Sequence, residues 1–203
     1  MKGDWLSKFR KTRSLAFTDE SYRRCRMAVE KILPLYKKHL RKGSKLLDLG
    51  FGPGCTGIPL SHHFQVVGLD KDERIIDYAL ENARKFGGKI EFKKGDIRHL
   101  DKLFAKDSFD AVTSAGVMEH FPEEDIKKLV EKQLRIAPVV FIHVPTGNDG
   151  KVVDEDGIEK NLWTVEYWLN HILKDFKIVE HQTIKPNQKM PRFIELNIVL
   201  KRG

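Results

Sequence analysis

Three glycines at alternate positions follow a short apolar segment in the stretch KLLDLGFGPGCTG, residues 45–57. Glycine has no Cβ, so the backbone here can turn sharply and lie directly against a ligand, and a following helix offers unpaired N–H groups. The third glycine is Gly54, one residue earlier than the G-x-G-x-x-G spacing of dinucleotide sites, and Asp48 would repel a pyrophosphate. The stretch therefore predicts a site for a ligand with a cationic or amine-bearing portion.

The elements that must position this turn are short apolar strands that alternate with amphipathic helices. Five strands are predicted at about 45–49, 64–70, 89–92, 108–113 and 138–144. This alternation is typical of a parallel sheet covered by helices on both faces. Two further segments, 176–183 and 192–201, predict an antiparallel pair that closes the sheet. The expected fold is α/β: a doubly wound, mostly parallel seven-stranded sheet with an N-terminal helix and an antiparallel C-terminal strand pair.

The length of 203 residues fits one domain. We expect residues 1–43 to form an N-terminal helical lid or cap segment and residues 44–203 to form a Rossmann-like core. Within the first segment, Thr18 opens a helix that extends to about Leu40, and Pro34 predicts a kink or a break in it.

The basic excess of the chain belongs to its N-terminal part. Residues 1–45 contain 14 Lys+Arg and 4 Asp+Glu, whereas the other 158 residues contain 23 and 25. One interpretation is an electrostatic surface for nucleic acid, and the other is a solvated helix face. The second is favoured because the segment has no Gly/Arg repeat, no zinc-ligand spacing and no recognisable RNA-binding module.

The apolar runs, the N-terminus and the two cysteines bear on the compartment and partners of the protein. No apolar run is long enough to cross a bilayer, and the N-terminus has no signal-peptide core, so no membrane association is expected. Cys25 and Cys55 are far apart in sequence, and we expect no disulfide, no bound metal and a cytoplasmic location. No feature indicates an oligomeric state.

Four segments carry a resemblance to a known family: LLDLGFGPG (46–54), VGLD (67–70), GDI (95–97) and FDAVTSAGVMEHF (109–121). Together they resemble the motifs of the class I S-adenosylmethionine-dependent methyltransferases, over about residues 45–145. The resemblance implies that S-adenosyl-L-methionine is the cofactor.

By that resemblance, eleven residues near the strand ends hold the cofactor: Asp48, Gly50, Phe51, Gly52, Gly54, Asp70, Lys71, Asp96, Ile97, Ser114 and Val117. The glycines would line its methionine portion, with Asp48 on the ammonium group. Asp70 would bind the ribose hydroxyls, and Asp96 would accept from the adenine amino group between Lys71 and Ile97. The alternatives are that Asp70 caps the next helix, with Glu73 completing a capping box, and that Asp96 is an ordinary turn residue.

The fourth motif bears on the acceptor. Methyltransferases of nucleic-acid base amines commonly carry an Asn/Asp-Pro-Pro-aromatic run where this chain has residues 114–117, SAGV. We therefore expect a small-molecule acceptor. A general base helps the reaction only where the nucleophile arrives protonated. His120 is the first candidate for this base, and His143 is the second. A purely structural hydrogen bond is the alternative for each histidine. The acidic residues 149 and 154–156 would attract a cationic amine in one interpretation and form a solvated turn in the other, which is favoured.

The predicted function is transfer of a methyl group from S-adenosylmethionine to a small molecule. One alternative is an RNA methyltransferase that holds phosphates with the basic N-terminal segment. Another is a non-catalytic S-adenosylmethionine-binding regulatory module.

Overall fold

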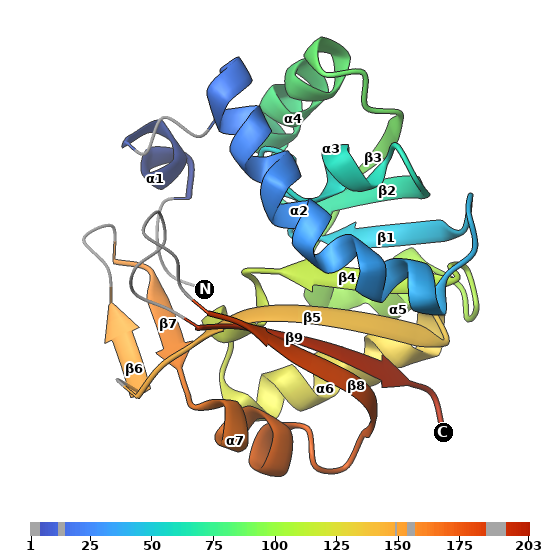
Figure 1. The fold of residues 1–203 in the computed structure, drawn as a ribbon, viewed down its shortest axis with the longest axis vertical. Helices are drawn as coiled ribbons and strands as arrows, with labels where there is room; N and C mark the ends of the chain where they lie inside the picture. Colours follow the sequence, from blue (N-terminus) through green and yellow to red (C-terminus); the bar gives the residue numbers. More distant parts are fainter. Residues whose placement is uncertain (1–4, 12–14, 149, 154–156, 186–193) are drawn as a thin grey trace.

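A seven-stranded sheet organises the protein (Figure 1). The structure, a computed structural model, describes residues 5–11, 15–148, 150–153, 157–185 and 194–203. The strands are β1 (Lys45–Leu49), β2 (Gln65–Asp70), β3 (Ile90–Lys94), β4 (Ala111–Ala115), β5 (Val139–Thr146), β6 (Gly150–Val153), β7 (Glu159–Leu162), β8 (Lys177–Ile184) and β9 (Ile194–Lys201). The strand order is β3-β2-β1-β4-β5-β9-β8, and β6 and β7 form a separate antiparallel hairpin.

Strands β1 to β5 are parallel, and β9 runs antiparallel to both β5 and β8. The expected fold class is therefore confirmed. The strand order reverses between β1 and β4, which is where sheets of this type leave a crevice at the carboxyl ends of the strands.

Helices cover both faces of the sheet. They are α1 (Trp5–Lys11), α2 (Asp19–His39), α3 (Gly57–Leu60), α4 (Glu73–Lys85), α5 (Leu100–Leu103), α6 (Glu123–Ile136) and α7 (Val165–Tyr167), with 3-10 turns η1 (Ile97–His99) and η2 (Met118–His120) and a π-helical turn η3 (Trp168–Ile172). In α2 the Thr18 side chain accepts from the Ser21 N–H, which caps the helix where the sequence predicts its start. Pro34 lies inside α2 without ending it.

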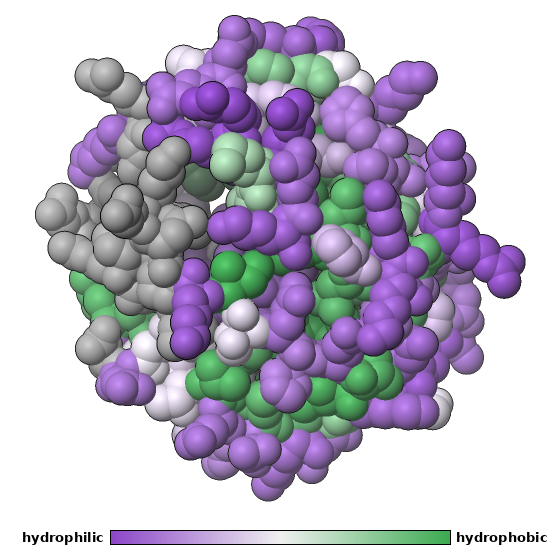
Figure 2. Space-filling view, viewed as in Figure 1, coloured by the Kyte–Doolittle hydropathy of each residue, from purple (hydrophilic) through white to green (hydrophobic). Residues whose placement is uncertain are grey.

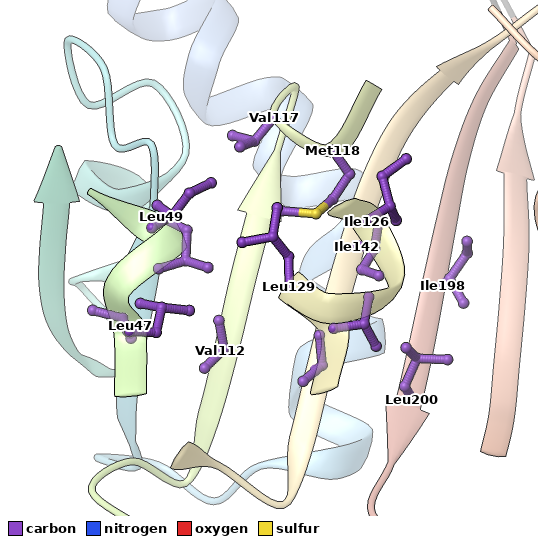
Figure 3. Close-up of a cluster of buried hydrophobic side chains, with 14 of the residues drawn as sticks. Leu47, Leu49, Val112, Val117, Met118, Ile126, Leu129, Ile142, Ile198 and Leu200 are labelled. Carbon is purple, nitrogen blue, oxygen red and sulfur yellow. The ribbon is translucent and has the colours of Figure 1, made fainter. Parts of the chain in front are cut away.

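Alternate residues of the central strands enter two different cores, because successive side chains of a strand point to opposite faces. Leu46 and Phe141 belong to the core under α2 and α3. Leu47 and Ile142 belong to the core under α6, to which Leu129 of α6 also belongs (Figure 3). Burial of each such side chain stabilises the fold by roughly 1.5–3 kcal/mol.

The prediction that the two cysteines are unpaired is wrong. Cys25 and Cys55 form a disulfide, with 5.0 Å between their Cα atoms. Cys25 lies on the buried side of α2, and α2 crosses the sheet close to the glycine turn that contains Cys55. Packing of the helix therefore brings together two residues 30 positions apart. The cysteines therefore no longer support the expectation of a reducing, cytoplasmic location.

The β6–β7 hairpin lies between β5 and α7 in the chain. This hairpin and α1 both lie beyond the edge of the sheet where the parallel strands end (Figure 1). Figure 2 shows that the face in view is largely hydrophilic, with hydrophobic residues exposed in patches. No helix in the part of the chain that the structure describes is long and apolar enough to cross a membrane.

Candidate active site

The glycine turn after β1 adopts the conformation that its sequence predicts. Gly50 has φ +60°, and Gly54 has φ +101°, both in the left-handed region that favours glycine. A Cβ on Gly50 would lie 2.8 Å from Val117 Cγ2, so a side chain there would collide with the segment after β4. The Phe51 N–H donates to the Leu69 carbonyl, which holds the turn against β2.

A cavity of about 230 Å³ opens beside this turn at the carboxyl ends of β1, β2 and β4. Its walls come from α1, the glycine turn, the end of β2, the start of α4, and the segment after β4. The lining residues are Trp5, Phe9, Asp48, Gly50, Phe51, Gly52, Pro53, Cys55, Thr56, Asp70, Ile75, Ala115, Gly116, Val117 and His120.

Asp48 is a deeply buried carboxyl group that lines the cavity. It is 2% exposed, and its Oδ2 has no hydrogen-bond partner in the described part of the chain. Burial, with a smaller contribution from the Asp70 charge, raises the pKa of Asp48 to about 8. A buried carboxyl group in this state favours a cationic ligand, because a nearby positive charge stabilises its ionised form.

Asp70 lies at the end of β2 and does not cap α4. Its Oδ2 accepts from the Gly52 N–H at 3.0 Å and its Oδ1 from the Asp72 N–H at 3.1 Å. The N-cap is Asp72, whose side chain accepts from the Arg74 N–H, so the predicted capping role of Asp70 is wrong. Asp70 therefore links the glycine turn to the next strand end and faces the cavity. Burial raises its pKa.

Six of the eleven residues predicted to hold the cofactor line the cavity, and five do not. The six are Asp48, Gly50, Phe51, Gly52, Asp70 and Val117, and the five are Gly54, Lys71, Asp96, Ile97 and Ser114. Asp96 caps η1 and accepts from the Arg98 guanidinium, which lowers the pKa of Asp96 to about 2. Ser114 is fully buried in β4.

The structure separates the two candidate bases. His120 lines the cavity, where the Trp5 ring packs edge-on against it with 4.8 Å between ring centroids. The His120 Nδ1–H donates to the Glu159 carbonyl at 2.6 Å, since a carbonyl oxygen only accepts. In the neutral form of this imidazole the lone pair is therefore on Nε2, which lies 3.7 Å from Glu119 Oε1.

His143 lies inside the sheet, in β5, and does not line the cavity. Its Nδ1 is hydrogen-bonded to Asn197 Oδ1, and its Nε2 lies 2.6 Å from the Tyr36 hydroxyl. Burial lowers the pKa of His143 to about 4, so this imidazole is neutral at pH 7. These contacts match the structural alternative that the sequence left open for His143.

Sequence reasoning missed Asn82, a buried amide on α4. Its Nδ2 donates to the Leu15 carbonyl at 2.7 Å and the Pro53 carbonyl at 3.0 Å, and its Oδ1 accepts from the Phe17 N–H at 2.8 Å. One side chain thus joins the N-terminal segment to the glycine turn. The available signal was a polar residue beside Ala79 and Ala83, which share the buried face of this helix.

These residues fit S-adenosylmethionine in the way that the sequence predicted for its methionine end. The unpartnered Asp48 oxygen suits the cofactor ammonium group, and the glycine turn leaves the cavity free of side chains at Gly50 and Gly52. No group of three or more His, Cys, Asp or Glu side chains among the described residues is arranged to hold a metal ion. The acidic residues 149 and 154–156 lie outside the described residues.

Comparison with known proteins gives matches over the same part of the chain. Residues 46–137 match a family described as "Methyltransferase domain". Phosphoethanolamine N-methyltransferase 1 of Arabidopsis thaliana is 31% identical over 90 residues, which cover 43% of this chain and 18% of that protein. A probable cobalt-precorrin-6B C(15)-methyltransferase (decarboxylating) of Saccharolobus solfataricus is 32% identical over 97 residues, 45% of this chain and 48% of that protein. The chain thus spans less than half the length of these two curated relatives.

A solved structure shows the same fold over nearly the whole chain. It is the 1,6-didemethyltoxoflavin-N1-methyltransferase of Burkholderia thailandensis with bound 1,6-didemethyltoxoflavin and S-adenosylhomocysteine, at 18% identity. The similarity covers 98% of this chain and 86% of that one, with a TM-score of 0.71. Residues 46–137 are thus similar to a methyltransferase domain, and the chain shares the fold of a solved methyltransferase.

Proposed function

We propose that the protein transfers a methyl group from S-adenosylmethionine to a small-molecule acceptor. The observation that carries this proposal is Asp48, a buried carboxyl group with an unpartnered oxygen in a cavity bordered by a glycine turn. When bound, the cofactor supplies a methyl group on a positively charged sulfur, so alignment of the nucleophile provides much of the rate.

The walls of the cavity support a small acceptor. It is bounded by the glycine turn on one side and by Gly116, Val117 and His120 on the other, and α1 places Trp5 and Phe9 in the same wall. The structurally similar protein from Burkholderia is a 1,6-didemethyltoxoflavin-N1-methyltransferase with bound 1,6-didemethyltoxoflavin, as its name states. The phosphoethanolamine N-methyltransferase named above likewise takes a small acceptor.

His120 is the residue that we propose as general base, because it lines the cavity and its Nε2 carries the lone pair. His143 is not part of the proposal, since both of its ring nitrogens have partners inside the sheet.

We also propose that α1 is a lid. Leu6 packs with Leu15 and Ile75, and this apolar contact holds Trp5 and Phe9 at the cavity. Such a lid would exclude water once the cofactor is bound.

Calorimetry with S-adenosylhomocysteine tests the cofactor part of the proposal. Wild-type protein is expected to bind it, and Asp70→Ala is expected to weaken binding by about 1–3 kcal/mol, the usual range for loss of a charged hydrogen-bond partner. Tight NAD binding without any heat from S-adenosylhomocysteine would refute the proposal. Unchanged affinity in a folded Asp70→Ala protein would remove Asp70 from the site.

Radiolabelled methyl transfer tests the acceptor class. The purified protein is incubated with labelled S-adenosylmethionine and, separately, with a small-metabolite extract and with total RNA. Label is expected in the small-metabolite fraction. Label in RNA, with binding that falls steeply as salt increases, would instead support the nucleic-acid alternative. Cofactor binding without transfer to either fraction would favour a regulatory module.

A further inference from the structure

Glu119 is a buried carboxyl group beside the cavity that the cofactor does not account for. It is 3% exposed, and its Oε2 has no hydrogen-bond partner in the part of the chain that the structure describes. Burial of a carboxyl oxygen without a partner costs free energy, and most such groups in folded proteins are satisfied. The unpartnered oxygen therefore indicates that a ligand completes this position.

The position of Glu119 places it on the acceptor side of the cavity. Its Oε1 lies 3.7 Å from Nε2 of His120, and it would lie 3.6 Å from a Cβ on Gly116. Both His120 and Gly116 line the cavity. Glu119 does not itself line the cavity, and it lies next to Gly116, a lining residue that has no side chain. Asp48, which suits the cofactor ammonium, belongs instead to β1 and the glycine turn.

The charges around the cavity select the kind of ligand. Among the described residues, its lining includes the carboxylates of Asp48 and Asp70 but no lysine or arginine, although the chain has a net charge of +8. Trp5 and Phe9 add aromatic surface. Carboxylates and aromatic faces attract cations, whereas a phosphate or carboxylate ligand would find no counter-ion in this lining.

We propose that Glu119 binds the ammonium group of the methyl acceptor, and that the acceptor is an amine with a small apolar body. This inference rests on the proposed function. The imidazole of His120, with its lone pair on Nε2, adds a second hydrogen-bond acceptor on the same side as Glu119. Two acceptors suit an ammonium group, which carries two or more N–H donors, better than a hydroxyl group, which carries one.

For this amine acceptor, Glu119 replaces His120 as the group that receives the proton, because Glu119 is the group that binds the ammonium. An ordinary ammonium group and an ordinary glutamate differ by about 6 in pKa, which disfavours the transfer. Burial raises the pKa of Glu119 to about 7, against smaller opposing effects of its own backbone N–H and of Lys160 and Lys8. The difference in pKa is therefore roughly halved, and the transfer becomes accessible.

Methyl transfer to the amine begins with the loss of one proton. The ammonium group gives one proton to the Glu119 carboxylate and becomes a neutral amine with a lone pair. That lone pair forms the bond to the methyl carbon, and the C–S bonding pair stays with the sulfur. The methylated nitrogen then carries the positive charge, and the proton on Glu119 returns to solvent.

Three probes with the same aromatic frame test the inference: 2-phenylethylamine, 2-phenylethanol and 3-phenylpropanoate. Each is titrated into the wild-type protein saturated with S-adenosylhomocysteine, and Trp fluorescence reports binding, because Trp5 lines the cavity. The amine is expected to bind at least about tenfold more tightly than the alcohol, the effect of one charge-assisted hydrogen bond. The carboxylate is expected to bind more weakly than either.

Glu119→Gln, which keeps the shape of the side chain and removes its charge, is expected to abolish the preference for the amine. Glu119→Asp is expected to restore part of it. The matched control is Glu124→Gln, an exposed residue on α6 with the same change of charge, and this variant is expected to behave as wild type. Thermal unfolding and calorimetry with S-adenosylhomocysteine verify that each variant is folded and binds the cofactor product.

Equal binding of the amine and the alcohol by wild-type protein would overturn the inference, and so would failure of all three probes to bind. A preference that survives in Glu119→Gln would overturn it as well. Failure of wild-type protein to bind S-adenosylhomocysteine would instead refute the proposed function, so the two failures are distinguishable.

Discussion

Cys25 of α2 and Cys55 of the glycine turn are joined by a disulfide, which links α2 directly to the wall of the cofactor cavity. The bond closes a loop across 30 residues of sequence. The cavity wall and the helix that covers the sheet are therefore covalently coupled.

Reduction of this disulfide is expected to lower the free energy of unfolding by about 3–4 kcal/mol, from the entropy of a loop of this length. Urea unfolding with and without dithiothreitol measures the change. The double variant Cys25→Ser, Cys55→Ser should resemble the reduced protein and should not respond to the reductant. Identical unfolding curves for wild-type protein under both conditions would show that the bond is absent or does not stabilise the fold.

Gly50 is expected to be intolerant of a side chain for a reason that Gly87 does not share. Both residues have positive φ, +60° and +71°, but a Cβ would contact Val117 only at Gly50 and would meet nothing within 4 Å at Gly87. Gly87→Ala should cost about 1 kcal/mol of stability from backbone strain alone. Gly50→Ala should cost more and should weaken S-adenosylhomocysteine binding by at least about tenfold. Chemical unfolding and calorimetry measure the two effects, and equal behaviour of the variants would contradict the collision with Val117.

Asp48 is expected to make cofactor binding depend on pH. In the free protein its pKa is about 8, so the group is protonated at lower pH, whereas a bound ammonium group favours the ionised form. Affinity for S-adenosylhomocysteine should therefore rise as pH increases from 6 to 8, by up to about tenfold per pH unit. Calorimetry in buffers of different ionisation enthalpy should detect proton release on binding. Asp48→Asn should bind more weakly and lose this dependence; if it keeps the wild-type slope, another group is responsible.

Asn82→Ala is expected to loosen both the N-terminal segment and the glycine turn, because three backbone groups lose their partner. The free energy of unfolding should fall by about 2–4 kcal/mol, typical of a broken buried hydrogen-bond network. S-adenosylhomocysteine binding should weaken as well. The exposed neighbour Glu81→Ala is the control and should change neither quantity. Normal cofactor affinity in Asn82→Ala would mean that the turn keeps its shape without this amide.

Trp5→Ala and Phe9→Ala are each expected to weaken S-adenosylhomocysteine binding, because both rings line the cavity from α1. The exposed residue Arg10 of the same helix provides the control, and Arg10→Ala should bind as wild type. Calorimetry measures the affinities, and titration with RNA at several salt concentrations runs in parallel. Loss of RNA binding in Arg10→Ala, with cofactor affinity intact in all three variants, would contradict the lid and favour a nucleic-acid surface.

The sequence by itself was enough to predict the sheet and the turn that borders the cavity. The apolar runs around Leu47 and Val67 are local signals, and strands buried on both faces require such runs. The glycine turn was predictable for the same reason, since its conformation depends on residues that are adjacent in the chain. The helix capped by Thr18 is another local signal, and it was placed correctly.

Only the tertiary structure decided which polar groups meet. Cys25 and Cys55 pair, Asn82 joins two distant segments, and His143 is enclosed by Tyr36 and Asn197. Each of these contacts connects residues that are about 30 or more positions apart, and their spacing in the sequence carries no information about the distance between them. The packing of helices and strands sets that distance, and it buries Asp48 and Glu119, each with one carboxyl oxygen that has no partner among the described residues.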